Sequence, residues 1–553
     1  MRLVECVPNF SEGRNMQVID QITAEIKKVK GVKLLDVDPG YDTNRTVVTF
    51  VGDVEPVKEA AFQAIKKSHE LIDMSKHKGA HPRFGACDVC PLVPVSGITM
   101  EETAEEARKL GKRLGEELNF PVYFYEKAAM TPERENLAVV REGEYEALEE
   151  RMKDEANRPD AGPFEFNPTT GATAVGAREF LIAYNINLNT TNVKPVKAIA
   201  NVIREQGRKK KDKDGNKVHI PGMFKNCKAI GWYVDDYKIA QISINLTNYN
   251  VTNMHHVYDA VEKLALEKGM RVTGSEIVGV VPKKALLDAG VHYLEKQGMC
   301  AGIDEDEIIK IACRSLGVSD VAEFNPEEKI IERMIKEEKG LVDLTLTEFN
   351  DMLSTDSPAP GGGSVAALCG ALAASLGSMV MNLSFGKKGY KENNIRFNEI
   401  AKDLQARKYE LLKLIDEDTN AFNIMMGAAG SLKKAKKSGD ECLIKKAEKE
   451  NRYAQELGTT IPLKVMEKSL LLTPIIKEVA AIGNTNAASD AGVAALMINS
   501  AVKSAGLNVK INLSGFDKQD KFRVETEAKM AEFLHELDCK TNGIVDDVEK
   551  IIG

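Results

Sequence analysis

The chain has 553 residues, more than one hydrophobic core usually serves, so its length predicts two or more domains. Hydrophobic residues make up 43% and charged residues 29% of the chain, which excludes an intrinsically disordered protein, and the net charge of -8 argues against a dedicated nucleic-acid binder. Its nine cysteines are spread thinly and its N-terminal sequence lacks the apolar core of a secretory signal, so we expect a reduced, cytoplasmic protein without a disulfide framework.

Hydrophobic periodicity in the first part of the chain predicts the order β-α-β-β-α-β. Strands are expected at 3–8, 32–37, 46–51 and 86–95 and helices at 18–29 and 57–72, with a further helix at 101–118 and a strand at 122–125. The same order returns from about residue 180, with strands at 180–188, 229–234, 240–246 and 272–281 and helices at 196–205 and 257–267. Two such units predict two α/β subdomains with ferredoxin-like sheets.

A basic segment, RKKKDKDGNK at 208–217, separates the first helix of the second unit from its next strand. Its charge is compatible with a nucleic-acid patch, but its aspartates and glycine are typical of a solvated loop. We therefore expect a loop there and no nucleic-acid partner.

After residue 325 strand patterns almost vanish and helical patterns dominate, which predicts an all-α bundle. The expected helices span 361–382, 395–428, 441–470, 485–505 and 520–550. The expected domain boundaries are two α/β subdomains at 1–179 and 180–325, a charged linker at 326–341 and a helical domain at 342–553.

The stretch 359–386 carries no charged residue and is long enough to span a bilayer. It is dominated by Gly, Ala and Ser, and its flanks lack aromatic belts, so a close-packed buried helix is favoured over a membrane span. The preceding glycines resemble a phosphate-binding turn but lack the Gly-Lys-Ser/Thr ending of a P-loop. Small residues four apart predict instead that other helices approach closely, at Ala367/Ala371, Gly370/Ala374 and Ala373/Gly377.

The segment DMSKHKGAHPRFGACDVCPLVP at 73–94 concentrates candidate catalytic side chains between a predicted helix and strand. His77 and His81, with Cys87 and Cys90, have spacings that a zinc site could use. A glycine and a proline break any helix that would aim both imidazoles one way, and the cysteines fall on a predicted strand, so we expect no metal. A structural histidine and a general acid/base histidine remain alternatives.

Long stretches of the α/β part strongly resemble glutamate formimidoyltransferase over roughly residues 1–325. They are VECVPNFSEG at 4–13, DVDPGYDTNRTV at 36–47, IDMSKHKGAHPRFGACDVCPLVPV at 72–95, GAREFLIAYNINL at 176–188 and GWYVDDYKIAQISINL at 231–246. The resemblance implies that His81, in the HPR motif, is catalytic. It also implies a folate-binding segment made of Gly162, Pro163, Phe164, Glu165, Phe166, Asn167, Pro168, Thr169, Thr170 and Gly171.

The chemistry of formimino transfer suits a histidine. The folate N5 must lose a proton as it attacks the amidine carbon, and the departing glutamate amine must gain one. A single imidazole near its own pKa can do both in turn, without a metal. Asp38 or Asp42 would orient His81 or the substrate, whereas the alternative is that the sequence around Asp38 simply forms a turn.

In the helical part, one aspartate interrupts an apolar seam. Leu411, Ile415, Asp418, Phe422 and Met425 share one face of a predicted helix. Burial in such a seam should raise the pKa of Asp418 toward a value useful for proton transfer. The alternative is a structural aspartate that neighbouring Ser or Asn side chains satisfy.

Three segments resemble formimidoyltetrahydrofolate cyclodeaminase, over about 342–553: TDSPAPGGGSVAALCGALAASLGSMV, IDEDTNAF and GNTNAASDAGVAALM. The resemblance implies that Asp418 is the catalytic aspartate, which would protonate the departing ammonia when N10 attacks the formimino carbon. Asn484, Ser489 and Asp490 are candidate polar residues of the same site.

Both halves together resemble the formimidoyltransferase-cyclodeaminase family. That resemblance implies transfer of the formimino group from N-formimidoyl-L-glutamate to tetrahydrofolate, a substrate that carries a polyglutamate tail, and then closure to 5,10-methenyltetrahydrofolate with loss of ammonia, in histidine degradation. It also implies a homo-oligomer built as a ring of dimers and small-molecule substrates. The charge of the basic segment at 208–217 makes it a candidate to hold the polyglutamate tail. Formiminoglycine as the donor, a methenyltetrahydrofolate cyclohydrolase in place of the cyclodeaminase, and a non-catalytic folate-binding scaffold are the alternatives.

Overall fold

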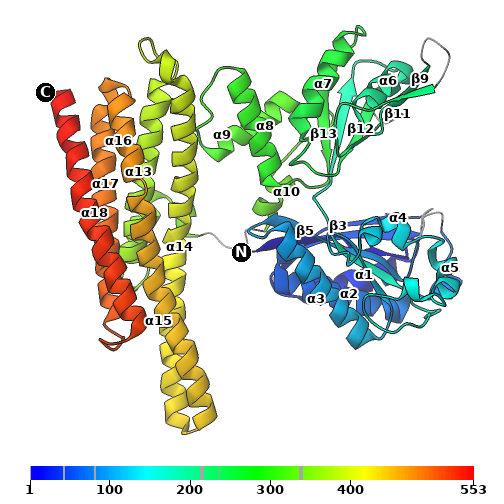
Figure 1. Ribbon diagram of the computed structural model, residues 1–553, viewed down its shortest axis with the longest axis horizontal. Coiled ribbons are helices and arrows are strands. Elements are labelled where there is room, and N and C mark those ends of the chain that lie inside the picture. Colours follow the sequence, from blue (N-terminus) through cyan, green and yellow to red (C-terminus); the bar gives the residue numbers. More distant parts are fainter. Residues whose placement is uncertain (1, 42–43, 80–82, 212–216, 236, 336–339) are drawn as a thin grey trace. The chain divides into compact units, whose positions relative to one another are not determined.

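The computed structural model describes residues 2–41, 44–79, 83–211, 217–235, 237–335 and 340–553 (Figure 1). The chain packs into two compact units. The first unit consists of Met1–Ala289 with Cys313–Lys336, and the second of Gly290–Ala312 with Glu337–Gly553.

The first unit begins with a seven-stranded sheet whose central order is β3-β4-β1-β5. Its strands are β1 (Leu3–Cys6), β2 (Asn9–Phe10), β3 (Val32–Gly40), β4 (Arg45–Asp53), β5 (Cys87–Ser96), β6 (Val122–Glu126) and β7 (Thr173–Ala177). The central four pair antiparallel, whereas β7 pairs parallel to both β5 and β6. The strand predicted at 3–8 ends at Cys6, and a short strand, β2, follows at Asn9–Phe10. The predicted β-α-β-β-α-β order is confirmed.

Helices cover this sheet because alternate strand residues are apolar on that face. Buried side chains of β1, β4 and β5 pack in one cluster with α1 (Met16–Lys28), α2 (Val54–Leu71) and α3 (Met100–Leu118). A second, smaller cluster lies on other residues of β5, β6 and β7 and includes side chains from α4 (Leu137–Val140) and α5 (Glu144–Arg151).

The second sheet repeats the first one's central topology. Its antiparallel strand order is β11-β12-β8-β13. The elements are β8 (Ile182–Leu188), α6 (Val193–Ile203), β11 (Cys227–Val234), β12 (Ile239–Leu246), α7 (Met254–Leu266) and β13 (Val272–Val278). In both sheets the first strand lies between the third and the fourth, which confirms the two ferredoxin-like subdomains.

The basic segment differs from the loop expected there. β9 (Arg208–Lys211) and β10 (Lys217–Ile220) pair antiparallel, with Arg208 opposite Ile220. Backbone groups form this ladder without any apolar pattern in the side chains, so composition alone gave no strand signal. The residues 212–216 between the two strands lie outside the described residues.

The second unit is built mainly from long helices (Figure 1). They are α12 (Leu346–Leu353), α13 (Gly362–Ser384), α14 (Asn394–Ser438), α15 (Glu441–Leu470), α16 (Thr473–Ile482), α17 (Ala488–Leu513) and α18 (Lys521–Ile552). The predicted helical domain is therefore confirmed, although α14 runs ten residues beyond its predicted end at 428. Four other helices precede these along the chain, namely α8 (Lys283–Lys296), α9 (Glu305–Leu316), α10 (Pro326–Lys329) and α11 (Ile331–Met334).

Residues of the turn between α8 and α9 belong to this second unit. The Ala301 backbone N–H donates to Asn398 Oδ1 at 2.8 Å, and Asn382 Nδ2 donates to the Gly302 carbonyl at 2.7 Å. A Cβ at Gly302 would lie 2.1 Å from the Ala401 Cβ, so the turn needs a glycine to lie against α14.

α13 lies at the centre of the helical unit. Among the described residues it alone is long and apolar enough to cross a membrane by length and composition, and most of its apolar stretch is buried against neighbouring helices. A Cβ at Gly377 would lie 2.4 Å from Ile476 Cδ1 and 2.9 Å from Leu404 Cδ1. The close approach predicted from its small residues is confirmed.

Two glycines should respond in opposite ways to a larger residue. Gly377→Val would overpack the contact with α14 and α16 and lower the free energy of unfolding by about 1–3 kcal/mol. Gly427→Ala, on α14, should raise it by about 1 kcal/mol, because the added methyl group would have no heavy atom within 4 Å and alanine favours the helix. Urea unfolding followed by circular dichroism measures both, and equal effects of the two variants would contradict the packing described for α13.

Candidate active sites

The segment that contains His81 is fixed at both of its ends. His81 itself and Asp42 lie outside the described residues. His77 Nε2 lies 2.9 Å from the Asn44 carbonyl, and Arg83 Nε donates to His77 Nδ1 at 3.2 Å. Because Nδ1 accepts, the proton must be on Nε2, so His77 is a neutral imidazole. Burial lowers its pKa, which agrees with a structural role.

Arg83 holds the other end of the segment against α5. Its guanidinium donates to Glu146 through Nη1 at 2.9 Å and Nη2 at 2.5 Å. The Tyr145 N–H donates to the Arg83 carbonyl at 2.9 Å. The described residues on either side of His81 are therefore hydrogen bonded to the turn before β4 and to α5.

The predicted folate segment lies directly against this region. The Met74 N–H donates to the Thr169 carbonyl and the Ala86 N–H donates to the Thr170 carbonyl, both at 2.8 Å. Tyr145 Oη donates to the Pro168 carbonyl at 2.5 Å. The end of the 162–171 segment is thus hydrogen bonded on both sides of His81 along the chain.

Inside that segment the backbone is tightly organised. Asn167 Oδ1 accepts from the Thr169 N–H at 3.0 Å and the Thr170 N–H at 3.2 Å. Gly171 has a positive φ of 66°, and its backbone comes so close to Phe84 that an added Cβ would lie 2.5 Å from the Phe84 carbonyl oxygen. Several backbone groups of the segment therefore already have hydrogen-bond partners within the protein.

Two buried acids in this unit were not singled out from the sequence. Asp88 is fully buried, accepts from the Phe84 N–H at 3.1 Å and pairs with Arg141 Nη1 at 2.6 Å. Burial raises the pKa of Glu5 to about 7, against the opposing effect of Arg178. Both acids stand within otherwise apolar predicted strands, and that interruption was the available signal.

The aspartates proposed as helpers occupy different places. Asp38 is exposed on β3, opposite Val47 of β4. Cys87 and Cys90 lie on β5 as predicted and are fully buried, with Cys90 Sγ 3.6 Å from Cys6 Sγ. Within the described ranges there is no group of three or more His, Cys, Asp or Glu that could hold a metal ion.

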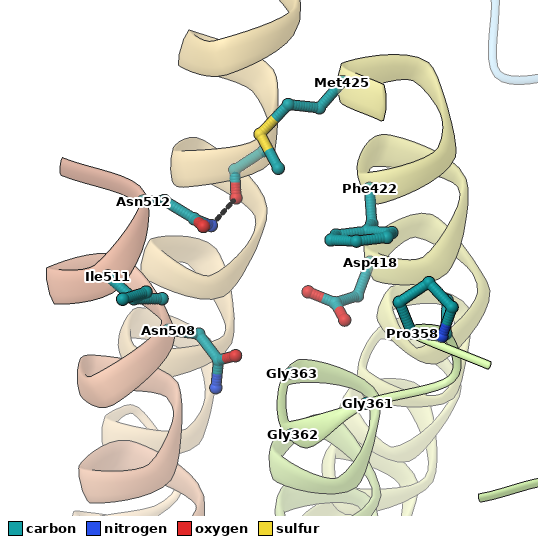
Figure 2. A pocket seen from close by; sticks show the side chains of 12 residues that line it. Pro358, Gly361, Gly362, Gly363, Asp418, Phe422, Met425, Asn508, Ile511 and Asn512 are labelled. Carbon is teal, nitrogen blue, oxygen red and sulfur yellow. Dashed lines mark hydrogen bonds between the residues drawn. The ribbon is translucent and has the colours of Figure 1, made fainter. Parts of the chain in front are cut away.

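A cavity of about 330 Å³ lies in the helical unit around Asp418 (Figure 2). Its walls come from α14, α15, α17 and the first turn of α13, together with residues that precede α13. The lining residues are Pro358, Ala359, Gly361, Gly362, Gly363, Asp418, Phe422, Met425, Gly458, Asn508, Ile511 and Asn512.

The Asp418 carboxyl is held against the N-terminal turn of α13. Ser364 Oγ lies 3.3 Å from Asp418 Oδ2 and can donate to it, although the same hydroxyl can instead donate to the Ile415 carbonyl at 3.0 Å. A Cβ at Gly363 would lie 2.2 Å from Asp418 Oδ1. Burial raises the pKa of Asp418, and hydrogen bonds from Ser364 oppose the shift. The pKa direction predicted from the apolar seam is confirmed.

The other polar candidates lie away from this cavity. The Asn484 N–H donates to Ser384 Oγ at 2.7 Å, at the opposite end of α13 from Gly363. Ser489 and Asp490 are in the first turn of α17, roughly 27 Å along the helix axis from Asn508 at 1.5 Å per residue. The structure brings Asn508 and Asn512 to the cavity instead. Two asparagines four residues apart in the apolar sequence GLNVKINL were the signal for them.

Three family descriptions match almost the whole chain. "Formiminotransferase domain, N-terminal subdomain" matches residues 3–178, "Formiminotransferase domain" matches 183–336 and "Formiminotransferase-cyclodeaminase" matches 345–532. The chain is 40% identical over 553 residues to the formimidoyltransferase-cyclodeaminase of Rattus norvegicus, with 99% of each chain covered.

Two shorter relatives match one part each. A glutamate formimidoyltransferase of Thermoplasma acidophilum is 45% identical over 304 residues, which cover 55% of this chain and 95% of the relative. A methenyltetrahydrofolate cyclohydrolase of Methylorubrum extorquens is 36% identical over 173 residues, which cover 31% of this chain and 81% of the relative.

Removing the Ser364 hydroxyl should raise the pKa of Asp418 further. Hydrogen bonds from Ser364 favour the ionised carboxylate, so Ser364→Ala leaves burial less opposed. Titration of ¹³C-labelled aspartate side chains by NMR measures the shift. The control is Ser375→Ala, because Ser375 Oγ donates to the Ala371 carbonyl within α13. A lower pKa in Ser364→Ala, or an equal shift in the control, would contradict this description.

Proposed function

The chain belongs to the formimidoyltransferase-cyclodeaminase family, and we propose that its two activities are divided between His81 in the first unit and Asp418 in the second. The protein is a bifunctional enzyme, a glutamate formimidoyltransferase and a formimidoyltetrahydrofolate cyclodeaminase, with tetrahydrofolate as a substrate. The observation that carries the assignment of Asp418 is its carboxyl, which lies half-buried at the wall of a cavity with its pKa raised.

In the transfer step, N5 of tetrahydrofolate attacks the amidine carbon of N-formimidoyl-L-glutamate. His81 accepts the proton that N5 loses and delivers it to the glutamate nitrogen, and the carbon–nitrogen bond to glutamate then breaks. The segment 162–171 holds the folate beside this imidazole. Its hydrogen bonds on both sides of the His81 segment support that role.

In the cyclisation step, N10 attacks the formimino carbon of 5-formimidoyltetrahydrofolate, whose terminal nitrogen enters the reaction already protonated, as =NH₂⁺. Asp418, in its protonated form, donates a proton to the former imino nitrogen, and ammonia leaves. The resulting carboxylate then takes up the proton that N10 loses, so the residue is restored and 5,10-methenyltetrahydrofolate forms. A raised pKa supports this role because a carboxyl group must be protonated in part at working pH to act as an acid.

Several finer properties belong to the same proposal. The enzyme acts in histidine degradation, in the cytoplasm, on a polyglutamated folate, and as a homo-oligomer arranged as a ring of dimers. Eight described cysteines are free thiols, which supports a reducing location. Exposed apolar side chains along α13 and α17 support association, for example Leu383 at 52% and Leu507 at 67% exposure. The names of the shorter relatives support formiminoglutamate over formiminoglycine.

A cyclohydrolase is the second candidate for the helical unit, because one relative of that unit carries that name. Water would then open the methenyl ring and no ammonia would be released. The relatives that match the full length support the cyclodeaminase.

Substitution of each proposed residue should stop one step only. His81→Ala should lower the transfer rate at least a hundredfold and leave cyclisation of supplied 5-formimidoyltetrahydrofolate intact, and Asp418→Asn should do the reverse. Absorbance of methenyltetrahydrofolate and release of ammonia report the second step, and glutamate formation reports the first. Asp403→Asn is the control on α14, because Asp403 is exposed and pairs with Arg407. Loss of both steps in either folded variant would contradict the division.

Charge reversal of the basic hairpin tests the polyglutamate part of the proposal. The triple change of Lys209, Lys210 and Lys217 to Glu should increase release of free 5-formimidoyltetrahydrofolate when the folate is polyglutamated, and not when it is a monoglutamate. Chromatography of quenched reactions measures the released intermediate. The matched control makes the same changes at three exposed lysines of α14, Lys433, Lys434 and Lys437. Unchanged release, or an equal rise in the control, would count against the tail-binding role.

A further inference from the structure

The cavity around Asp418 has a second polar wall, formed by one face of α17. Asn508 and Asn512 are four residues apart on that helix, so both side chains lie on the same face. Figure 2 shows the Asn508 amide directed into the cavity from the side opposite Asp418. Neither residue belongs to the motifs that identify the family in the sequence.

The glycine turn of α13 lies between the carboxyl and the first of these amides. A Cβ at Gly363 would lie 2.2 Å from Asp418 Oδ1, and a Cβ at Gly362 would lie 3.3 Å from Asn508 Nδ2. Consecutive glycines therefore contact the two side chains. A ligand that sits over this turn can touch Asp418 and Asn508 together.

Hydrogen bonds fix which end of each amide faces the ligand. Asn508 Nδ2 donates to the Ser504 carbonyl at 3.0 Å, and Asn512 Nδ2 donates to the Gly458 carbonyl at 2.8 Å. A carbonyl oxygen can only accept, so the atom facing it must be the NH₂ group of the amide. Neither amide oxygen accepts a hydrogen bond from the described residues, which leaves both oxygens available to the cavity.

The charged and amide side chains that line the cavity thus present mainly hydrogen-bond acceptors to it. Its lining includes the Asp418 carboxyl and two amides whose oxygens are unused, and it includes no lysine, arginine or histidine among the described residues. Such a wall favours a ligand group that donates N–H bonds, above all one that carries positive charge. It disfavours a group that presents only a carbonyl oxygen, because two acceptors then face each other without a proton between them.

We propose that Asn508 and Asn512 are specificity-determining residues that select the N–H-bearing formimino group over an isosteric formyl group. The proposal rests on the proposed function of the Asp418 cavity. The protonated formimino group of 5-formimidoyltetrahydrofolate carries N–H donors on its terminal nitrogen, and Asn508 accepts one of them while Asp418 supplies the proton with which ammonia departs. In 5-formyltetrahydrofolate an oxygen takes the place of that nitrogen, and no donor faces the amide oxygen.

The consequence for the reaction is directional. After ring closure the carbon bridges N5 and N10 and has lost its terminal nitrogen, so the product offers no donor at this position. The amide wall therefore holds the substrate more tightly than the product. It also distinguishes deamination from the interconversion of methenyl and formyl groups by water, because a formyl group donates no hydrogen bond to either amide oxygen.

The test compares two ligands in the full-length enzyme supplied with 5-formimidoyltetrahydrofolate. Asn508→Leu is nearly isosteric and removes the acceptor, so the KM for the formimidoyl substrate should rise roughly tenfold to a hundredfold. The inhibition constant of 5-formyltetrahydrofolate against the same step should stay unchanged or fall. The inhibition constant divided by the KM should therefore drop at least tenfold. A merely structural effect would raise both constants together, and that result would overturn the proposal.

Two further variants complete the test. Asn508→Asp keeps an acceptor at the same place and should retain the preference for the formimidoyl ligand, so it tests the proposal even where the leucine variant does not fold. Asn499→Leu is the control on the same helix, because Asn499 Nδ2 donates to Thr541 Oγ1 outside the cavity. A lost preference in Asn508→Asp, or an equal loss in Asn499→Leu, would overturn the assignment. Asp418→Asn tests the proposed function separately, through the rate of turnover at saturating substrate.

Discussion

The helical site depends on the absence of a side chain at Gly363. The first turn of α13 packs so closely on α14 that a methyl group there would overlap the Asp418 carboxyl. That contact places two hydrogen-bond donors of Ser364, its backbone N–H and its hydroxyl, against the carboxyl. The small residues that follow let α14 and α16 approach along the rest of α13, so one packing rule builds both the core and the site.

Two opposing effects set the acidity of Asp418. The N-terminal end of α13 and the Ser364 hydrogen bonds favour the carboxylate, whereas burial favours the neutral acid. Burial is the larger effect, so a larger fraction of this carboxyl is protonated near neutral pH than in an exposed aspartate. In the α/β unit, His77 has both of its ring nitrogens engaged, one by the Asn44 carbonyl and the other by Arg83. Neither nitrogen therefore offers a lone pair to a metal ion.

Periodicity in the sequence predicted those features that one segment determines by itself. The apolar seam of α14 predicted the raised pKa of Asp418, the small residues of α13 predicted close helix packing, and alternation predicted both ferredoxin-like sheets. What periodicity could not predict is which residue of a distant helix faces the seam. Asn484 looked polar and local to a motif, yet it caps the far end of α13, whereas Asn508 reaches the cavity because α17 crosses there. The β9–β10 hairpin was missed for a related reason, since backbone pairing leaves no pattern in charged side chains.

The orientation of an amide can carry as much chemical information as its identity. An asparagine beside a substrate is ambiguous, since it can donate or accept, and only its other partner resolves the choice. Here the partners are main-chain carbonyls, one on the preceding turn of α17 and one on α15. Because the backbone of two packed helices holds those carbonyls in place, an amide that rotated would bring its oxygen against a carbonyl oxygen, with no proton between the two acceptors. The fold of the bundle therefore fixes the polarity of the wall, and that polarity matches a nitrogen leaving group that must carry protons to depart as ammonia.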